Sequence, residues 1–297
     1  MESPIGSWII IVRIKMIEAL QFEFMRNALL AGLLASIICG VIGTFVLVNR
    51  IVFISGGIAH ASYGGIGLAF YFGFSLLIGV LGFSLIIAFI IAFISIRAKH
   101  RVDTFIGVIW AVGMALGIIL LDLTPGYNVD LMSYLFGSIL TVPSSDLWLM
   151  TILVGLIMII IGYYYQDFVS LSYDDEFARI RGVPVKLLYF LLIAMIALTV
   201  VMVIRVVGLI LIIALLTIPP YISEKLSGSL FQMMIYSVCL NIIFIFTGLG
   251  LAYSFNLTSG ATIIMVAAAG FFLSLIPGLI RSGSSKIYNK DVNGGIE

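Results

Sequence analysis

Long, uninterrupted apolar segments dominate this sequence and restrict what it can fold into. A helix of about 20 apolar residues crosses the ~30 Å hydrocarbon layer of a bilayer. Nine segments approach that length: 28–48, 53–72, 75–96, 104–122, 146–165, 187–203, 206–222, 229–250 and 261–280. We therefore predict an all-α polytopic membrane protein with about nine transmembrane helices, in a range of eight to ten.

The composition supports this fold class. Of the 297 residues, 62% are hydrophobic and only 10% are charged, whereas soluble domains carry roughly 25% charged residues. The net charge of +1 gives no reason to expect a nucleic-acid partner.

The two ends of the chain differ from the apolar region. Residues 1–24 contain a short apolar stretch followed directly by Arg13 and Lys15, which favours a helix at the membrane interface over a cleaved signal peptide. Residues 25–282 form the predicted transmembrane domain. Residues 283–297 are polar and contain glycines, which predicts a flexible tail.

The Lys and Arg residues predict an orientation, because cytoplasmic loops are enriched in positive charge. With nine spans, eleven of the 15 basic residues share one side: Arg50, Arg97, Lys99, Arg101, Arg179, Arg181, Lys186, Lys225, Arg281, Lys286 and Lys290. The other side has Arg13, Lys15, Arg26 and Arg205. The C-terminus is therefore expected in the cytoplasm of a cell-membrane protein.

The longest predicted cytoplasmic loop, 166–186, contains a short helix with marked ends. Ser172 is placed to cap its first turn, and the acidic residues 174–176 oppose the helix dipole there. Gly182 suits a left-handed C-terminal cap, and Pro184 prevents continuation. Two turns are marginal in isolation, so this helix is expected to pack on the protein's own membrane ends or on a cytosolic partner.

A lone histidine, His60, lies in the unusually small-residue segment ISGGIAHASYGGIGLAF (54–70). In a helix its neighbours form two rows, one of Gly57, Ala61, Gly65 and Ala69, and one of Gly56, His60 and Gly64. Such spacing permits close helix packing, with His60 as a hydrogen-bond donor across the contact. Alternatively, His60 lines a substrate path, because intramembrane ionisable groups are expensive and an imidazole suits Zn²⁺, Mn²⁺ or Fe²⁺.

Several stretches, in order, resemble the permease family of zinc, manganese and iron ABC importers. They are 24–50, 54–69, 101–120, 130–140, 174–183, 206–220 and 259–265, which together span nearly the whole membrane portion. The loop segment Glu176-Phe177-Ala178 with Gly182 resembles the Glu-Ala-Ala-x-x-x-Gly pattern by which importer permeases dock on their ATPase subunits.

The resemblance implies a metal-ion permease that is not itself an enzyme. It implies that Glu176, Phe177, Ala178, Ile180 and Gly182 couple the chain to a cytosolic ATPase dimer. Further implied partners are a second copy of the chain and an extracellular metal-binding protein. The metal ion is the substrate, and no resident cofactor is implied.

The resemblance also gives His60 a counterpart. Family members commonly read Asp-Ala-Leu-Ser-His where this chain reads Gly56-Gly57-Ile58-Ala59-His60. The metal-contacting histidine is therefore kept and the aspartate is replaced by Gly56. Around His60, the residues Gly56, Gly57, Ala61, Gly64 and Gly65 are expected to shape the pathway or its packing.

Two other classes of membrane protein, a secondary transporter and an intramembrane enzyme, fit the sequence less well. A secondary transporter would use His60 as a proton relay, but such carriers tend to hold several intramembrane carboxylates, and these segments have almost none away from their ends. An intramembrane enzyme would need a motif such as His-Glu-x-x-His, which the sequence lacks. It also lacks the Gly-x-x-x-x-Gly-Lys-[Ser/Thr] phosphate loop, so ATP must be bound by a partner.

Overall fold

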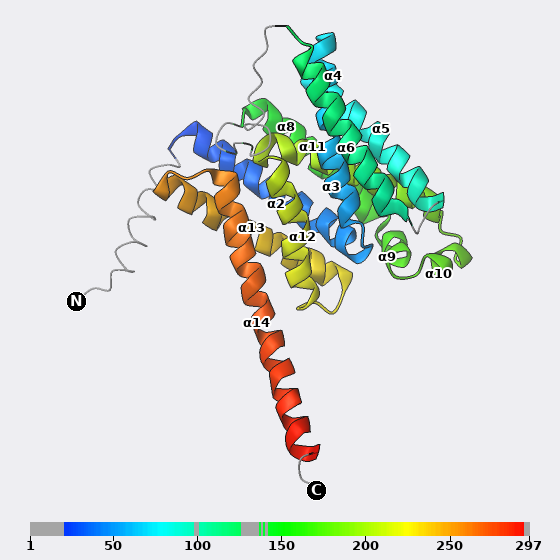
Figure 1. Ribbon diagram of the computed structural model, residues 1–297, viewed down its shortest axis with the longest axis vertical. Helices are drawn as coiled ribbons and strands as arrows, with labels where there is room; N and C mark the ends of the chain where they lie inside the picture. The colour runs from blue at the N-terminus through cyan, green and yellow to red at the C-terminus, as the bar shows by residue number, and fades with distance from the viewer. Residues whose placement is uncertain (1–20, 98–100, 126–136, 138, 140–141, 294–297) are drawn as a thin grey trace, which may run out of the picture.

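The computed structural model describes residues 21–97, 101–125, 137, 139 and 142–293, with side chains as far as Ile276. Every regular element in this part of the chain is a helix (Figure 1). Eight candidate spans are found there by length and apolar composition. They are α2 (Glu23–Val48), α3 with α4 (Val52–Ala61 and Tyr63–Phe72), α5 (Leu76–Arg97), α6 (Val102–Asp122), α8 (Ser144–Tyr163), α11 (Val185–Val207), α13 (Leu230–Phe255) and the Ser259–Ile276 part of α14 (Ser259–Asn293).

A ninth apolar helix, α12 (Leu209–Glu224), is shorter, with 16 residues. It follows α11 after a single residue, Gly208, whose backbone has φ 83° and ψ 168°. This region is essentially restricted to glycine, so Gly208 lets one helix end and the next begin without a loop. The predicted fold class and helix count of eight to ten are confirmed.

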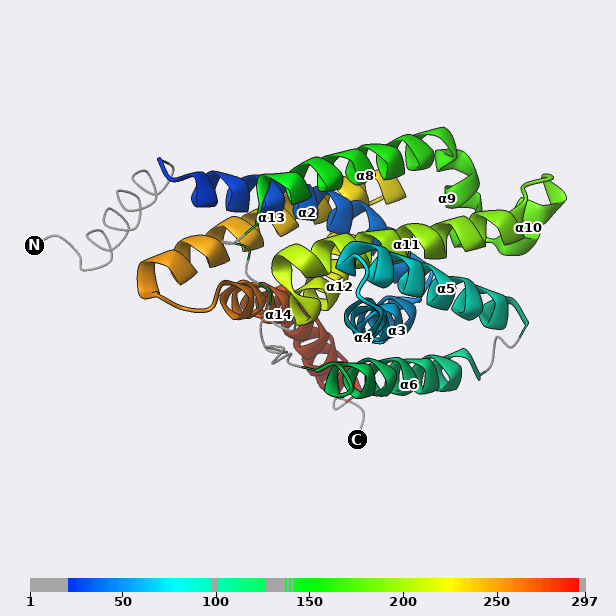
Figure 2. The same ribbon diagram turned by 90° about the horizontal axis from the view of Figure 1, so that it is seen from above.

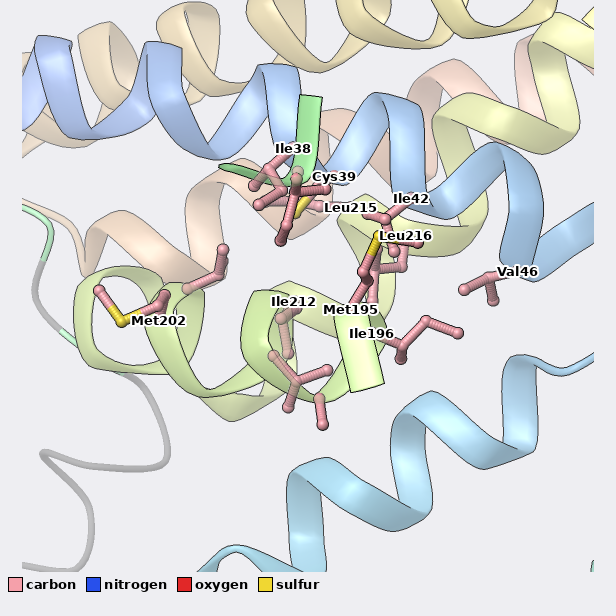
Figure 3. Packing of buried hydrophobic residues seen from close by; sticks show 14 of the residues in the cluster. Ile38, Cys39, Ile42, Val46, Met195, Ile196, Met202, Ile212, Leu215 and Leu216 are labelled. Carbon is pink, nitrogen blue, oxygen red and sulfur yellow. The ribbon is translucent and has the colours of Figure 1, made fainter. Parts of the chain in front are cut away.

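The protein core lies where α2, α11 and α12 meet. Buried side chains from these three helices interdigitate, among them Ile42, Ile196 and Leu215 (Figure 3). Close approach to α2 depends on its glycines, because a Cβ built at Gly43 would lie 2.8 Å from the backbone oxygen of Leu216 in α12. By contrast, α6 and α8 expose large apolar side chains such as Val112 and Ile159, as expected of helices that face lipid or another apolar surface.

Two short helices gather at one end of the bundle (Figure 2), namely α9 (Tyr165–Tyr173) and α10 (Asp175–Ile180). The predicted loop over 166–186 is therefore mostly helical, which corrects the expectation of a long loop with one helix. The α2–α3 turn at Arg50 and the start of α6 border the same cavity as α10. We call this end of the bundle the α9–α10 end.

The helices at both ends of the described chain cross the domain limits that the sequence predicted. The interfacial helix expected over 1–24 lies mostly outside the described residues, and α2 already begins at Glu23. At the other terminus, α14 continues as a helix to Asn293, past residue 283, where the flexible tail was expected to begin. Its first part packs on α12 and α13, and its C-terminal part extends away from the other helices (Figure 1).

Candidate functional site

The small residues of α3 and α4 pack directly against α6. A Cβ built at Gly113 would lie 2.7 Å from the Cα atom of Ala61. A Cβ at Gly57 would collide with the side chain of Ile106, and one at Gly117 with the carbonyl of Tyr63. Because the contact positions rise together along both helices, α3–α4 and α6 run parallel, at a separation that larger side chains would prevent.

The same span also contacts α5. A Cβ at Gly65 would lie 2.5 Å from the carbonyl oxygen of Gly79, and one at Gly64 would lie 2.6 Å from the ring of Phe83. A Cβ at Gly56 would meet only the Cδ1 atom of Ile213, at the ordinary distance of 3.9 Å. Gly57, Ala61, Gly64 and Gly65 thus lie in tight helix contacts, whereas Gly56 has room for a side chain on the face toward α12.

His60 lies on α3, eight residues after its start at Val52 and therefore ~12 Å along the span at 1.5 Å per residue. Its ring stacks on the indole of Trp110 in α6, with ring centroids 3.8 Å apart and planes inclined by 11°. The Nδ1 atom of His60 is buried and has no hydrogen-bond partner among the described residues. The side chain as a whole is only half-buried.

A metal ion at His60 would need more ligands than the described part of one chain provides. Within those residues no group of three or more His, Cys, Asp or Glu side chains is placed to hold a metal. The structure brings His60 together with Trp110, which the sequence interpretation missed. The usable signal was the pair Gly113 and Gly117, whose i, i+4 spacing mirrors the small residues around His60.

The helix α10 has a well-defined N-terminus, though its cap differs from the predicted one. The Oδ1 atom of Asp174 accepts hydrogen bonds from the backbone N–H groups of Glu176 (3.0 Å) and Phe177 (2.9 Å). The predicted cap, Ser172, instead belongs to α9, and its hydroxyl accepts a hydrogen bond from the side chain of Asn49 at 3.0 Å. The prediction failed because α9 continues to Tyr173, which leaves the cap position to Asp174.

The C-terminus of α10 agrees with the local pattern. Gly182 has φ +81°, and the backbone N–H of Val183 donates to the carbonyl of Ala178 at 3.0 Å. Ala178 is fully buried, whereas Phe177 and Ile180 are 52% and 84% exposed. The helix therefore rests on the bundle through its small residue and presents its two large apolar side chains outward.

A cavity of about 540 Å³ lies beside α10 at the α9–α10 end. Among its lining residues are Arg50, Asp103, Arg179 and Lys186, from the α2–α3 turn, α6, α10 and α11. Arg179 is paired with Asp175 at 3.3 Å within α10. The exposed helix α10 therefore borders the same cavity as the α2–α3 turn, the start of α6 and the start of α11.

An ion pair joins two spans at the opposite end of the bundle. The guanidinium of Arg205, near the end of α11, lies 3.0 Å from the carboxylate of Asp146, in the first turn of α8. The side chains are only 25% and 14% exposed, so each charge depends on the other for much of its stabilisation.

Eight candidate spans packed into one helical bundle, one of them built from small residues around a histidine, are the architecture of a multi-pass membrane permease. The chain belongs to the ABC 3 transport family, whose model matches residues 21–278. The resemblance noted in the sequence is thereby confirmed, and the protein is a multi-pass membrane permease.

Individual relatives cover most of the chain. It is 53% identical to an uncharacterized membrane protein of Synechocystis sp. over 88% of this chain and 92% of that protein. It is 32% identical to the manganese transport system membrane protein MntC of Listeria monocytogenes, over 86% and 91%. The structure of PsaBC from Streptococcus pneumoniae in complex with Fab matches with a TM-score of 0.79 and 31% identity, over 88% of this chain and 94% of that one.

Proposed function

We propose that this chain is the permease subunit of an ATP-driven importer that moves a divalent transition-metal ion, Zn²⁺, Mn²⁺ or Fe²⁺, into the cytoplasm. The observation that carries the proposal is His60, a half-buried imidazole ~12 Å along a membrane span. Ionisable groups at such depth usually mark a substrate path. The Listeria relative, named for manganese transport, supports the same class of cargo.

In this proposal His60 contacts the ion during its passage and does not hold it permanently. An imidazole nitrogen is a good ligand for these ions and a poor one for Na⁺ or Ca²⁺. The remaining ligands come from water, backbone carbonyls, another helix or the second copy of the chain. A site with few protein ligands suits a transporter, because the ion must leave as well as enter.

The energy for transport comes from a cytosolic ATPase dimer that binds α10. The exposed side chains of Phe177 and Ile180 provide an apolar contact surface for that partner, while Glu176 and the turn at Gly182 complete the segment. Since α10 is fixed to the bundle through buried Ala178, a displacement of the ATPase is transmitted to the spans. The proposal places the α9–α10 end and the C-terminus in the cytoplasm.

Two further partners complete the proposed importer. A second copy of the chain covers part of the apolar surface left exposed by the single bundle, and an extracellular metal-binding protein delivers the ion at the opposite end. A proton-coupled carrier is less favoured, because in the described spans each Asp or Glu lies within three residues of a helix end.

The test is ATP-dependent uptake into proteoliposomes that contain the chain, its ATPase and the metal-binding protein. Zn²⁺, Mn²⁺ and Fe²⁺ are compared for the native chain, His60→Ala and the control His100→Ala, which removes the only other histidine. We expect uptake of at least one metal that is strongly reduced by His60→Ala only. Native uptake by His60→Ala would refute the role of His60, and no uptake of any metal with an active, bound ATPase would refute the cargo.

A further inference from the structure

The rings of His60 and Trp110 are in close, stacked contact. The two rings are nearly parallel at 3.8 Å, which is shorter than the 4.5–7 Å typical of aromatic pairs. Trp110 is one of three tryptophans in the chain, and it is half-buried. One face of the imidazole is thus covered by an indole ring.

The helix packing fixes the register of this stack. His60 lies eight residues after the start of α3, and Trp110 lies eight residues after the start of α6 at Val102. The tight contacts of Gly57 with Ile106 and of Gly113 with Ala61 lie on either side of the stack. Since both contacts involve glycine, the helices approach closely enough for the two rings to meet.

The indole is itself held in place. Its Nε1–H donates to the Sδ atom of Met114, one turn further along α6, at 3.1 Å. Trp110 therefore has its polar edge satisfied within its own helix and presents its ring face to His60. A side chain with both its plane and its edge constrained is a suitable platform for orienting another ring.

His60 lacks the support that usually orients a metal-binding histidine. Such histidines almost always donate their second ring N–H to a carboxylate, carbonyl or water. Here Nδ1 is buried with no partner among the described residues, which leaves Nε2 as the nitrogen that can reach an ion. The stacked indole is the contact that can fix the plane of the imidazole in place of that hydrogen bond.

We propose that Trp110 is a positioning residue, which holds the His60 imidazole so that its Nε2 atom faces the passing metal ion. The inference rests on the proposed function of His60 and adds a residue that acts through it. Without the indole, the imidazole would sample several rotamers, and ordering it again on each binding event would weaken the interaction with the ion. Immobilising a side chain typically changes affinity by about 2- to 10-fold.

The first experiment compares Mn²⁺ uptake by three variants in the reconstituted importer. Trp110→Leu removes the ring face, Trp110→Phe keeps an aromatic face, and Trp148→Leu is the control, because Trp148 is a 72% exposed tryptophan elsewhere in the chain. We expect Trp110→Leu to raise the KM for Mn²⁺ by about 2- to 10-fold with a smaller change in maximal rate. Trp110→Phe should restore most of the native KM, and Trp148→Leu should leave it unchanged.

The outcomes separate this inference from the proposed function. If His60→Ala abolishes uptake while Trp110→Leu keeps the native KM, His60 contacts the ion and Trp110 does not position it. If Trp110→Leu and Trp110→Phe both lower only the maximal rate, Trp110 has a structural role and the inference is wrong. If His60→Ala transports normally, both the role of His60 and that of Trp110 are refuted.

A second experiment needs no transport. In a chain with Trp8→Phe and Trp148→Phe, Trp110 is the only tryptophan, and the purified protein is titrated with paramagnetic Mn²⁺. We expect saturable quenching of its fluorescence that disappears when His60→Ala is added. If the fluorescence is still quenched in the His60→Ala variant, the ion does not bind at His60 beside this ring. The same conclusion follows if the chain with native His60 shows no quenching at a Mn²⁺ concentration tenfold above the uptake KM.

Discussion

The packing of α3 against α6 makes a quantitative prediction for Gly113→Ala. The added Cβ would lie 2.7 Å from the Cα atom of Ala61, where ordinary contact begins at 3.4 Å. The helices must therefore separate by about 0.7 Å at this point, because the opposing atom belongs to the backbone and cannot rotate away. Overpacking of this kind costs about 1–3 kcal/mol.

Gly113→Ala also stabilises the helix, because alanine has a higher helix propensity than glycine. A control substitution on the same helix measures this stabilisation. Replacing Gly by Ala in a helix is favourable by about 0.5–1 kcal/mol, and this applies equally to Gly107→Ala. A Cβ built at Gly107 meets no atom within 4 Å. The difference in unfolding free energy between Gly113→Ala and Gly107→Ala therefore isolates the packing cost, and we expect it to be about 1–3 kcal/mol.

The assay is equilibrium unfolding of the purified chain in mixed micelles, titrated with SDS and followed by circular dichroism. Gly113→Ala should unfold at lower SDS than Gly107→Ala, with Gly107→Ala at or above the native midpoint. Coincident midpoints for the two variants would refute the close approach of α3 and α6, and with it the register that we assign to the His60–Trp110 stack.

Three further predictions concern the two ends of the bundle. Asp174→Ala removes both cap hydrogen bonds of α10 and should cost about 1 kcal/mol of local stability, seen as faster amide exchange in α10 than in the native chain; equal exchange would exclude Asp174 as the cap. In the double variant Glu176→Ala with Gly182→Pro, proline forces the φ of residue 182 away from +81°. We expect ATP hydrolysis to continue without metal uptake while the spans stay folded. Normal binding of the ATPase with normal uptake would refute the docking role of α10. Asp146→Ala should destabilise the chain by about 1–3 kcal/mol, because it leaves Arg205 unpaired. Adding Arg205→Ala should recover part of that loss in a double-mutant cycle. Additive losses from the two substitutions would show that the pair is not coupled.

Local sequence determined much of this protein. Apolar segments of membrane-spanning length specify helices wherever they are inserted, because the backbone groups have no water to bond with. The ending of α10 was also predictable, since Gly182 and Pro184 act on their own turn of the chain. Its beginning was not, because whether Ser172 or Asp174 caps α10 depends on where the preceding helix α9 ends.

Only the tertiary structure decided what surrounds the histidine. The sequence placed His60 among small residues. It could not show that Gly57 is in tight contact with α6 while Gly56 has room for a side chain, because this difference depends on which helix faces each row. The stack on Trp110 joins residues fifty positions apart, so no local pattern encodes it. It follows from glycines on two helices that allow close approach, and such a contact is determined by the packing of the whole bundle.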